Sequence, residues 1–89
     1  MKELNKKKIQ NKLRNKFLKS GVKMAGPETI YFSKDTKIGK NVIIEPYVVF
    51  GLKVKIGNNV TIKSFSHLEN CKVENKVDIG PYARIRPGT

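Results

Sequence analysis

Bulky apolar residues return at every sixth position along most of this chain. The row runs without interruption from Phe32 to Leu68 and, after one five-residue step, continues at Val73, Ile79 and Ile85. An α-helix repeats its side chains every 3.6 residues and a simple amphipathic strand every 2, so neither produces this spacing. A short strand followed by a tight bend, repeated around a column, does produce it. The complete first row is Phe32, Ile38, Ile44, Phe50, Ile56, Ile62, Leu68, Val73, Ile79 and Ile85.

A second row of mostly apolar residues follows four positions after the first. It consists of Thr36, Val42, Val48, Val54, Val60, Ser66, Val77 and Ala83. The position directly after a first-row residue is often small or polar, and it is glycine at Gly39, Gly51, Gly57 and Gly80. Because glycine tolerates the positive φ of a tight bend, we expect these glycines to relieve the bends. Further expected turn formers are Asn41, Pro46, Asn58, Asn59 and Pro81.

This repeat predicts the architecture of the chain. Three units make one triangular coil, and successive coils stack by parallel strand pairing at a spacing of about 4.8 Å. A single coil buries little surface alone, so stability must come from stacking, for which about three repeats are a practical minimum. The sequence therefore predicts a mainly β fold, a parallel β-helix of about three coils over residues 32–89.

The start of the chain has a helical pattern instead. Ile9, Leu13 and Phe17 follow at steps of four and predict one amphipathic, basic α-helix over residues 1–21, ended by a Ser-Gly pair. The narrow apolar stripe needs a surface to lie on, which the end of the coil stack or another domain could supply. Residues 22–31 contain a Gly-Pro pair and are predicted to form a connector.

The charge of the chain is strongly positive. Lys and Arg number 19 against 7 Asp and Glu, which gives a net charge of +12. Such an excess makes nucleic acid or an anionic surface a partner to consider. A coding bias toward Lys, Asn and Ile explains the same composition, and the basic residues lack the interleaved aromatic side chains on which bases stack. Nucleic-acid binding therefore stays an alternative, behind the hypothesis given below.

Cys71 is the single cysteine, so no internal disulfide can form and a reducing compartment is indicated. The sequence has no apolar run of about 18 residues that could span a membrane. It also lacks the apolar region of a secretory signal. We therefore expect a cytoplasmic protein.

Several segments of the sequence resemble one bacterial enzyme family. The segments are Gly21-Val22-Lys23-Met24, Pro27-Glu28-Thr29, Ile38-Gly39, Val42-Ile43-Ile44-Glu45-Pro46, Phe65-Ser66-His67-Leu68-Glu69 and Ile79-Gly80-Pro81-Tyr82-Ala83-Arg84-Ile85-Arg86-Pro87-Gly88. In this order they resemble bifunctional N-acetylglucosamine-1-phosphate uridyltransferase/glucosamine-1-phosphate acetyltransferase, the GlmU family, from Lys7 onward. The last segment is the most specific one.

The resemblance implies a left-handed parallel β-helix, preceded by the helix that links two catalytic domains. It implies assembly as a homotrimer through the β-helices, or association with the remaining parts of the enzyme. The family acetylates glucosamine-1-phosphate with acetyl-CoA and then transfers a uridylyl group. The product is UDP-N-acetylglucosamine, the precursor of peptidoglycan and lipopolysaccharide.

One site residue carries over from the family. Arg86 matches a residue that contacts the phosphosugar in the acetyltransferase site, and the planar fork of an arginine suits a phosphate because it stays charged and binds in two places. Tyr82 and Arg84 lie in the same segment and receive no function. His67 is the only histidine, has no nucleophile or carboxylate partner near it in sequence, and is predicted to be structural.

No catalytic, cofactor-binding or metal-binding residue is predicted in this chain. In the family, the nucleotide loop and the magnesium-binding Asp precede the linker helix. The acetyltransferase His and the acetyl-CoA site belong to later coils. The leading hypothesis is thus a fragment of the bifunctional enzyme, with a truncated β-helix that is inactive alone.

Two alternatives remain open. The first is a small association module whose open coil edge adds to a like chain or to a full-length homologue. The second is a basic nucleic-acid-binding protein, whose affinity would fall steeply with salt.

Overall fold

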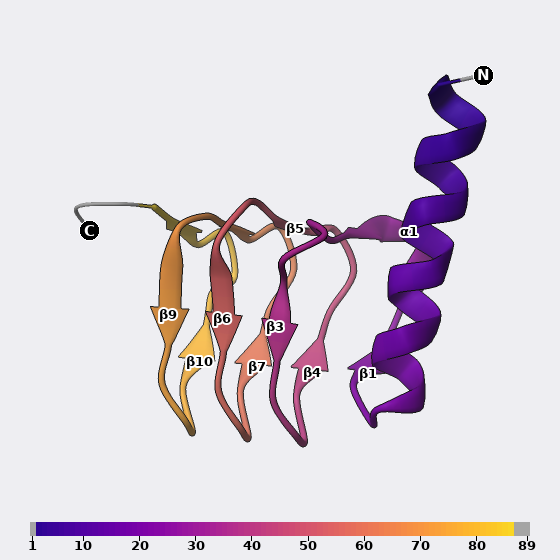
Figure 1. Cartoon of the computed structure of the whole chain (residues 1–89). Helices are drawn as coiled ribbons and strands as arrows, with labels where there is room; N and C mark the ends of the chain where they lie inside the picture. Colours follow the sequence, from indigo (N-terminus) through magenta and orange to yellow (C-terminus); the bar gives the residue numbers. More distant parts are fainter. Residues whose placement is uncertain (1, 87–89) are drawn as a thin grey trace.

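The computed structural model describes residues 2–86, with side chains from residue 6 onward. One helix, α1 (Lys2–Lys19), precedes a series of short strands and one 3₁₀ turn, η1 (Pro27–Thr29). The strands are β1 (Lys23–Met24), β2 (Ile30–Tyr31), β3 (Lys37–Ile38), β4 (Ile43–Ile44), β5 (Val48–Phe50), β6 (Val54–Ile56), β7 (Thr61–Ile62), β8 (His67–Leu68), β9 (Cys71–Val73), β10 (Asp78–Ile79) and β11 (Arg84–Ile85). Figure 1 shows the coils in a row that leads away from α1 toward the C-terminus.

Three parallel sheets form the three sides of a column. The first sheet has the order β1-β4-β7-β10, the second β2-β5-β8-β11 and the third β3-β6-β9. Within each sheet, neighbouring strands come from successive coils and pair in parallel. The described residues therefore contain three coils and two sides of a fourth, and the predicted mainly β fold with one N-terminal helix is confirmed.

Both predicted rows point into this column. The buried members of the two rows are Phe32, Ile44, Phe50, Ile56, Ile62, Leu68, Val73 and Ile79, and Thr36, Val42, Val48, Val54, Val60 and Ser66. The two hydroxyls among them are satisfied locally: Thr36 Oγ1 accepts from the Ser33 N–H at 3.0 Å, and Ser66 Oγ donates to the Lys63 carbonyl at 2.8 Å. Each fully buried Val, Leu, Ile or Phe contributes about 1.5–3 kcal/mol, so the stack of coils is the main source of stability.

The bends lie three residues after most first-row residues, and glycine does not form them. The non-glycine residues with positive φ are Asn41, Tyr47, Lys53, Asn59, Phe65, Asn70, Lys76 and Tyr82. The expectation of positive φ is confirmed at Gly80, where φ is 86°, and is wrong at Gly39, Gly51 and Gly57, which are not among the positive-φ glycines of the described chain.

The row glycines are needed for the close approach of successive coils instead. A Cβ on Gly39 would lie 2.7 Å from the Gly57 carbonyl oxygen, and one on Gly51 would lie 2.8 Å from Glu69 Cβ. Real Cβ atoms essentially never come this close to another heavy atom. Glycine therefore sets the coil-to-coil distance at these positions.

The segment 22–31, predicted as a connector, is part of the column. β1 pairs with β4 and β2 pairs with β5, while Val22 and Ile30 are buried. The first coil therefore begins at β1. It escaped the six-residue pattern because η1 replaces a simple bend between β1 and β2, and this interrupts the regular spacing.

Helix α1 closes the column at the first coil (Figure 1). The Phe17 ring lies 4.7 Å from the Phe32 ring, which in turn stacks on Phe50 at 5.1 Å. Leu13 is partly buried against this core, but Ile9 is 38% exposed. The predicted apolar stripe is thus only partly correct. Of the two surfaces considered for it, the end of the coil stack is the one that the helix contacts.

Two polar residues complete the contact of α1 with the first coil. Gln10 Nε2 donates to the Phe32 carbonyl at 2.8 Å, and the Phe32 N–H donates to Gln10 Oε1 at 2.8 Å. Arg14 Nε donates to the Ile30 carbonyl at 2.9 Å. These bonds satisfy main-chain groups at the edge of β2, where a further coil would otherwise pair, so the helix protects this edge.

Candidate functional site

Arg86 lies at the opposite end of the column from α1, directly after β11. The pairing of Arg84 with His67 and of Ile85 with Leu68 gives Arg86 the same register position as Glu69 in the preceding coil. Its side chain is exposed, as expected for a residue that follows an inward position. The structure thus places the predicted phosphosugar residue on the outside of the fourth coil.

The second sheet brings other basic groups to the same end. His67 and Arg84 are register partners on its outward face, and both are exposed. His67 therefore lies outside the core. Two arginines and a histidine lie in this outward region together with one carboxylate, that of Glu69, so donors that can bind phosphate outnumber acidic groups there.

Tyr82 belongs to a stack of exposed aromatic rings at the corner between the first and second sheets. Its ring stacks on Phe65 at 5.3 Å, and Phe65 stacks on Tyr47 at 5.2 Å, with interplanar angles of 6°. The three side chains are 56% (Tyr47), 54% (Phe65) and 74% (Tyr82) exposed. We call these three residues the aromatic ladder. All three have positive φ, a conformation that costs roughly 1–2 kcal/mol per non-glycine residue.

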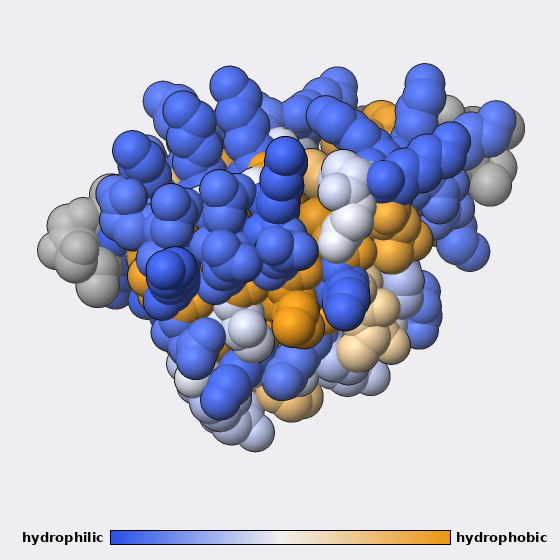
Figure 2. Space-filling model, turned by 90° about the horizontal axis from the view of Figure 1, so that it is seen from below, coloured by the Kyte–Doolittle hydropathy of each residue, from blue (hydrophilic) through white to orange (hydrophobic). Residues whose placement is uncertain are grey.

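The outward face of the third sheet carries lysines instead. Lys37 pairs with Lys55, and Lys55 pairs with Lys72, so three ammonium groups project from neighbouring strands. In a triangular column this side lies opposite the corner that holds the aromatic ladder. Binding of a single nucleic-acid strand uses cations and stacking rings on one surface, and the lysines of the third sheet lie apart from the aromatic ladder. Figure 2 shows hydrophilic side chains over much of the molecule seen from below, with apolar surface between them.

Cys71 occupies a position of the second row, because it is the register partner of Val54. This is where the five-residue step falls, and the bend at Asn70 absorbs the missing residue. Burial raises the pKa of the Cys71 thiol, and a backbone hydrogen bond at Glu69 opposes this effect only partly. The thiol consequently stays protonated at neutral pH and is a poor nucleophile.

Within residues 2–86, no group of three or more His, Cys, Asp or Glu side chains could hold a metal ion. None of the described helices has the length and apolar character needed to cross a membrane.

The sequence matches the family model described as "Bacterial transferase hexapeptide (six repeats)" over residues 35–70. Together with the three parallel sides of the column, these hexapeptide repeats indicate the left-handed form of the β-helix, as predicted.

Relatives from three bacteria match nearly the whole chain. The "Bifunctional protein GlmU" of Zymomonas mobilis is 53% identical over 79 residues, which are 89% of this chain. The proteins of the same name from Azorhizobium caulinodans and Wolbachia pipientis are 47% and 46% identical over 81 residues, or 91% of this chain. The chain spans only 18–19% of the length of these relatives. It is therefore a hexapeptide-repeat β-helix with an N-terminal helix that corresponds, over about nine tenths of its length, to one segment of the bifunctional GlmU proteins.

Proposed function

We propose that this chain is the linker helix and the first coils of a GlmU-like acetyltransferase β-helix, in which it supports the site without performing the chemistry. The 53% identity over 79 residues is the observation that carries this proposal. The reaction is the transfer of an acetyl group from acetyl-CoA to glucosamine-1-phosphate in the cytoplasm, as part of UDP-N-acetylglucosamine synthesis. The general base and the acetyl-CoA site come from other coils, and magnesium serves the uridyltransferase reaction elsewhere.

In this proposal Arg86 binds the phosphate of glucosamine-1-phosphate. Its guanidinium is exposed at the end of the column, near the outward positions of Arg84 and His67. The surrounding donors favour an anion there, and the fork of Arg86 gives the contact its direction. A rigid strand holds the residue, because β11 pairs with β8.

An NMR titration of the labelled chain with glucosamine-1-phosphate tests this function. We expect saturable shifts around residues 84–86, and about tenfold weaker binding in Arg86→Gln, since a hydrogen bond to a charged group contributes about 1.5–3 kcal/mol. Arg84→Gln removes a charge of the same sign two residues away and is the comparison: because Arg84 adds only to the general potential, this variant should weaken binding less than Arg86→Gln does. Adding acetyl-CoA to the sample should produce no acetylated sugar.

Turnover by this chain alone would overturn the supporting role. Equal weakening by Arg84→Gln and Arg86→Gln would instead show that only the general charge of the surface matters, and would remove Arg86 as a specific site residue.

We also propose that the chain forms a homotrimer through the aromatic ladder and its flanks. Ile43 on the first sheet and Val49 on the second are exposed on either side of this corner. A contiguous exposed apolar patch on a small protein indicates an interaction site. Other copies of the chain fit this corner better than they fit the third sheet. There the row of Lys37, Lys55 and Lys72 would be repelled by the same lysines of another copy.

Phe65→Asn is expected to abolish trimer formation while leaving the fold of the chain intact. Asn already occupies the corresponding bend at Asn41, Asn59 and Asn70, where it has φ between 44° and 59°. Asparagine adopts this left-handed conformation more readily than phenylalanine, so we expect the free energy of unfolding to change by less than about 1 kcal/mol. Sedimentation velocity should show the native trimer converting to monomer. Leu52→Asn is the control, because Leu52 is also exposed but lies outside the ladder and should leave the trimer intact. A trimer that persists in Phe65→Asn at the same concentration would exclude the ladder as the interface.

A further inference from the structure

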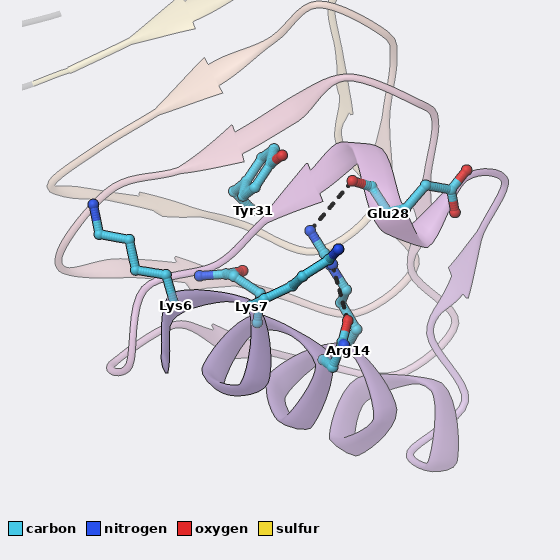
Figure 3. Close-up of a pocket in the computed structure, with 7 residues that line it drawn as sticks. Lys6, Lys7, Arg14, Glu28 and Tyr31 are labelled. Carbon is cyan, nitrogen blue, oxygen red and sulfur yellow. Dashed lines mark hydrogen bonds between the residues drawn. The ribbon is translucent and has the colours of Figure 1, made fainter. Parts of the chain in front are cut away.

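A pocket of about 530 Å³ lies between α1 and the first coil, at the end of the column that the proposed acetyltransferase function does not use. Its lining comes from the part of α1 between Lys6 and Arg14, from η1 and from β2. The lining residues are Lys6, Lys7, Gln10, Asn11, Arg14, Glu28 and Tyr31. Figure 3 shows Lys6, Lys7 and Arg14 on the helix, with Glu28 and Tyr31 across from them on the first coil.

The arginine in this pocket carries a buried charge. Arg14 is only 8% exposed. Its Nε donates to the Ile30 carbonyl at 2.9 Å, its Nη1 to Asn11 Oδ1 at 3.2 Å and its Nη2 to the Glu28 carbonyl at 3.3 Å. These partners are neutral oxygens, so they satisfy hydrogen bonds without supplying a counter-charge. The guanidinium also lies over the Tyr31 ring, with Cζ 5.1 Å from the centroid.

The rest of the lining increases the positive potential. Among the described lining residues, Lys6 and Lys7 add two ammonium groups and Glu28 adds one carboxylate. In Figure 3 the Glu28 side chain extends away from the two lysines, and its main-chain carbonyl, not its carboxylate, faces Arg14. A buried charge is costly unless an opposite charge lies close to it, so an anion in this pocket would be stabilised by all three cations.

We propose that this pocket binds a small organic phosphate, a phosphate monoester whose organic group is apolar or aromatic. The phosphate lies beside Arg14, where the flexible side chains of Lys6 and Lys7 on the same helix supply further charge-assisted donors. The volume of about 530 Å³ falls within the range of small-molecule sites and exceeds what a bare phosphate fills. The exposed part of the Tyr31 ring and the lysine methylene groups then contact the organic group.

Calorimetric titration with phenyl phosphate tests the proposal, with inorganic phosphate and phenol as reference probes. The Arg86→Gln chain is used as the background, so that the far end of the column does not contribute to the signal. An ionic strength of about 0.15 M limits long-range effects, because the Debye length is then about 8 Å. We expect 1:1 binding in which phenyl phosphate binds more tightly than either reference probe.

Two charge-matched double variants locate the site. Lys6→Gln with Lys7→Gln should weaken phenyl phosphate binding about tenfold or more, whereas Lys8→Gln with Lys12→Gln should change it less than about threefold. All four lysines are exposed on α1, so the variants should fold equally well, which circular dichroism checks. The NMR signal of Arg14 Nε–H gives an independent readout, and it should shift on titration of the background chain.

Three results would overturn the proposal. Equal weakening in both double variants would mean that phosphate responds only to the net charge of the helix. Phenol binding as tightly as phenyl phosphate would show that the phosphate group adds no affinity and that the pocket selects for the apolar ring alone. An Arg14 signal that stays in place while phenyl phosphate binds would put the ligand elsewhere on the chain.

Discussion

Ile56→Asp is expected to unfold the column, whereas Lys55→Asp, one residue away on the same strand, is expected to leave it folded. Ile56 is 4% exposed and lies in register between Ile38 and Val73 of the neighbouring coils. The substitution removes a buried apolar side chain and introduces a charge without a partner, a combination that costs about 4–5 kcal/mol or more. Domains have a total stability of about 5–15 kcal/mol, and a chain of this size lies near the lower end because it buries a smaller share of its surface, so most or all of the stability is lost.

Lys55→Asp tests the direction of the side chains. Neighbouring residues of a strand point to opposite faces, and Lys55 points outward between Lys37 and Lys72. A carboxylate there would meet two lysines, and opposite charges on neighbouring strands contribute about 0.2–1 kcal/mol. Urea unfolding followed by circular dichroism measures both variants. If Ile56→Asp and Lys55→Asp were equally stable, the six-residue register of the column would be wrong.

Gly39→Ala is expected to destabilise the chain by about 1–3 kcal/mol, the usual cost of overpacking a closely packed core. The added Cβ would lie 2.7 Å from the Gly57 oxygen and 2.8 Å from the Gly57 carbonyl carbon, both of them main-chain atoms of the next coil. Main-chain atoms held in parallel pairing cannot move aside as a flexible side chain can. The two coils must therefore separate locally. This separation weakens the hydrogen bond that the Gly39 N–H donates to the Ile56 carbonyl, in which nitrogen and oxygen are 2.9 Å apart in the native chain.

The expected destabilisation by Gly39→Ala is opposite in sign to the usual effect of such a substitution, so it tests directly whether coil spacing requires glycine. Gly39 is not among the positive-φ glycines, so alanine can adopt its backbone conformation. Replacing a glycine of this kind with alanine ordinarily stabilises a protein by about 0.4–1 kcal/mol. Lys40→Ala is the control: the main-chain N–H of residue 40, which donates to Asn58 Oδ1 at 2.8 Å, is retained. Urea unfolding of Gly39→Ala, Lys40→Ala and the native chain gives the comparison. A Gly39→Ala chain more stable than the native one would show that coil spacing does not require glycine here.

The two ends of the column differ in a way that bears on function. At the first coil, Gln10 and Arg14 occupy the edge of β2, so further pairing on that edge is blocked. At the fourth coil, β10 and β11 each have a pairing partner on one side only within the described residues. Continuation of the column is consistent with the proposed role as the first part of a longer acetyltransferase β-helix, with Arg86 near the junction.

The sequence by itself determined the coiled architecture. Both inward rows are visible as a six-residue period because each coil repeats the same local geometry, and the period survives the short step before Val73. The segment from Ile79 to Arg86 also indicated the GlmU resemblance, which the identity of 53% bears out. The helix over Lys2–Lys19 was recognisable from its spacing of apolar residues, although only Phe17 of that stripe is fully buried.

Only the tertiary structure decided how the coils and the helix fit together. The role of Gly39 depends on the main chain of the next coil, and the polar contact of Gln10 with Phe32 spans 22 residues. The first coil was hidden because η1 breaks the period, and strand pairing alone reveals it. The pocket around Arg14 likewise combines α1 with the start of the column. Such features depend on distances between residues far apart in the chain, and a local repeat carries no information about those distances.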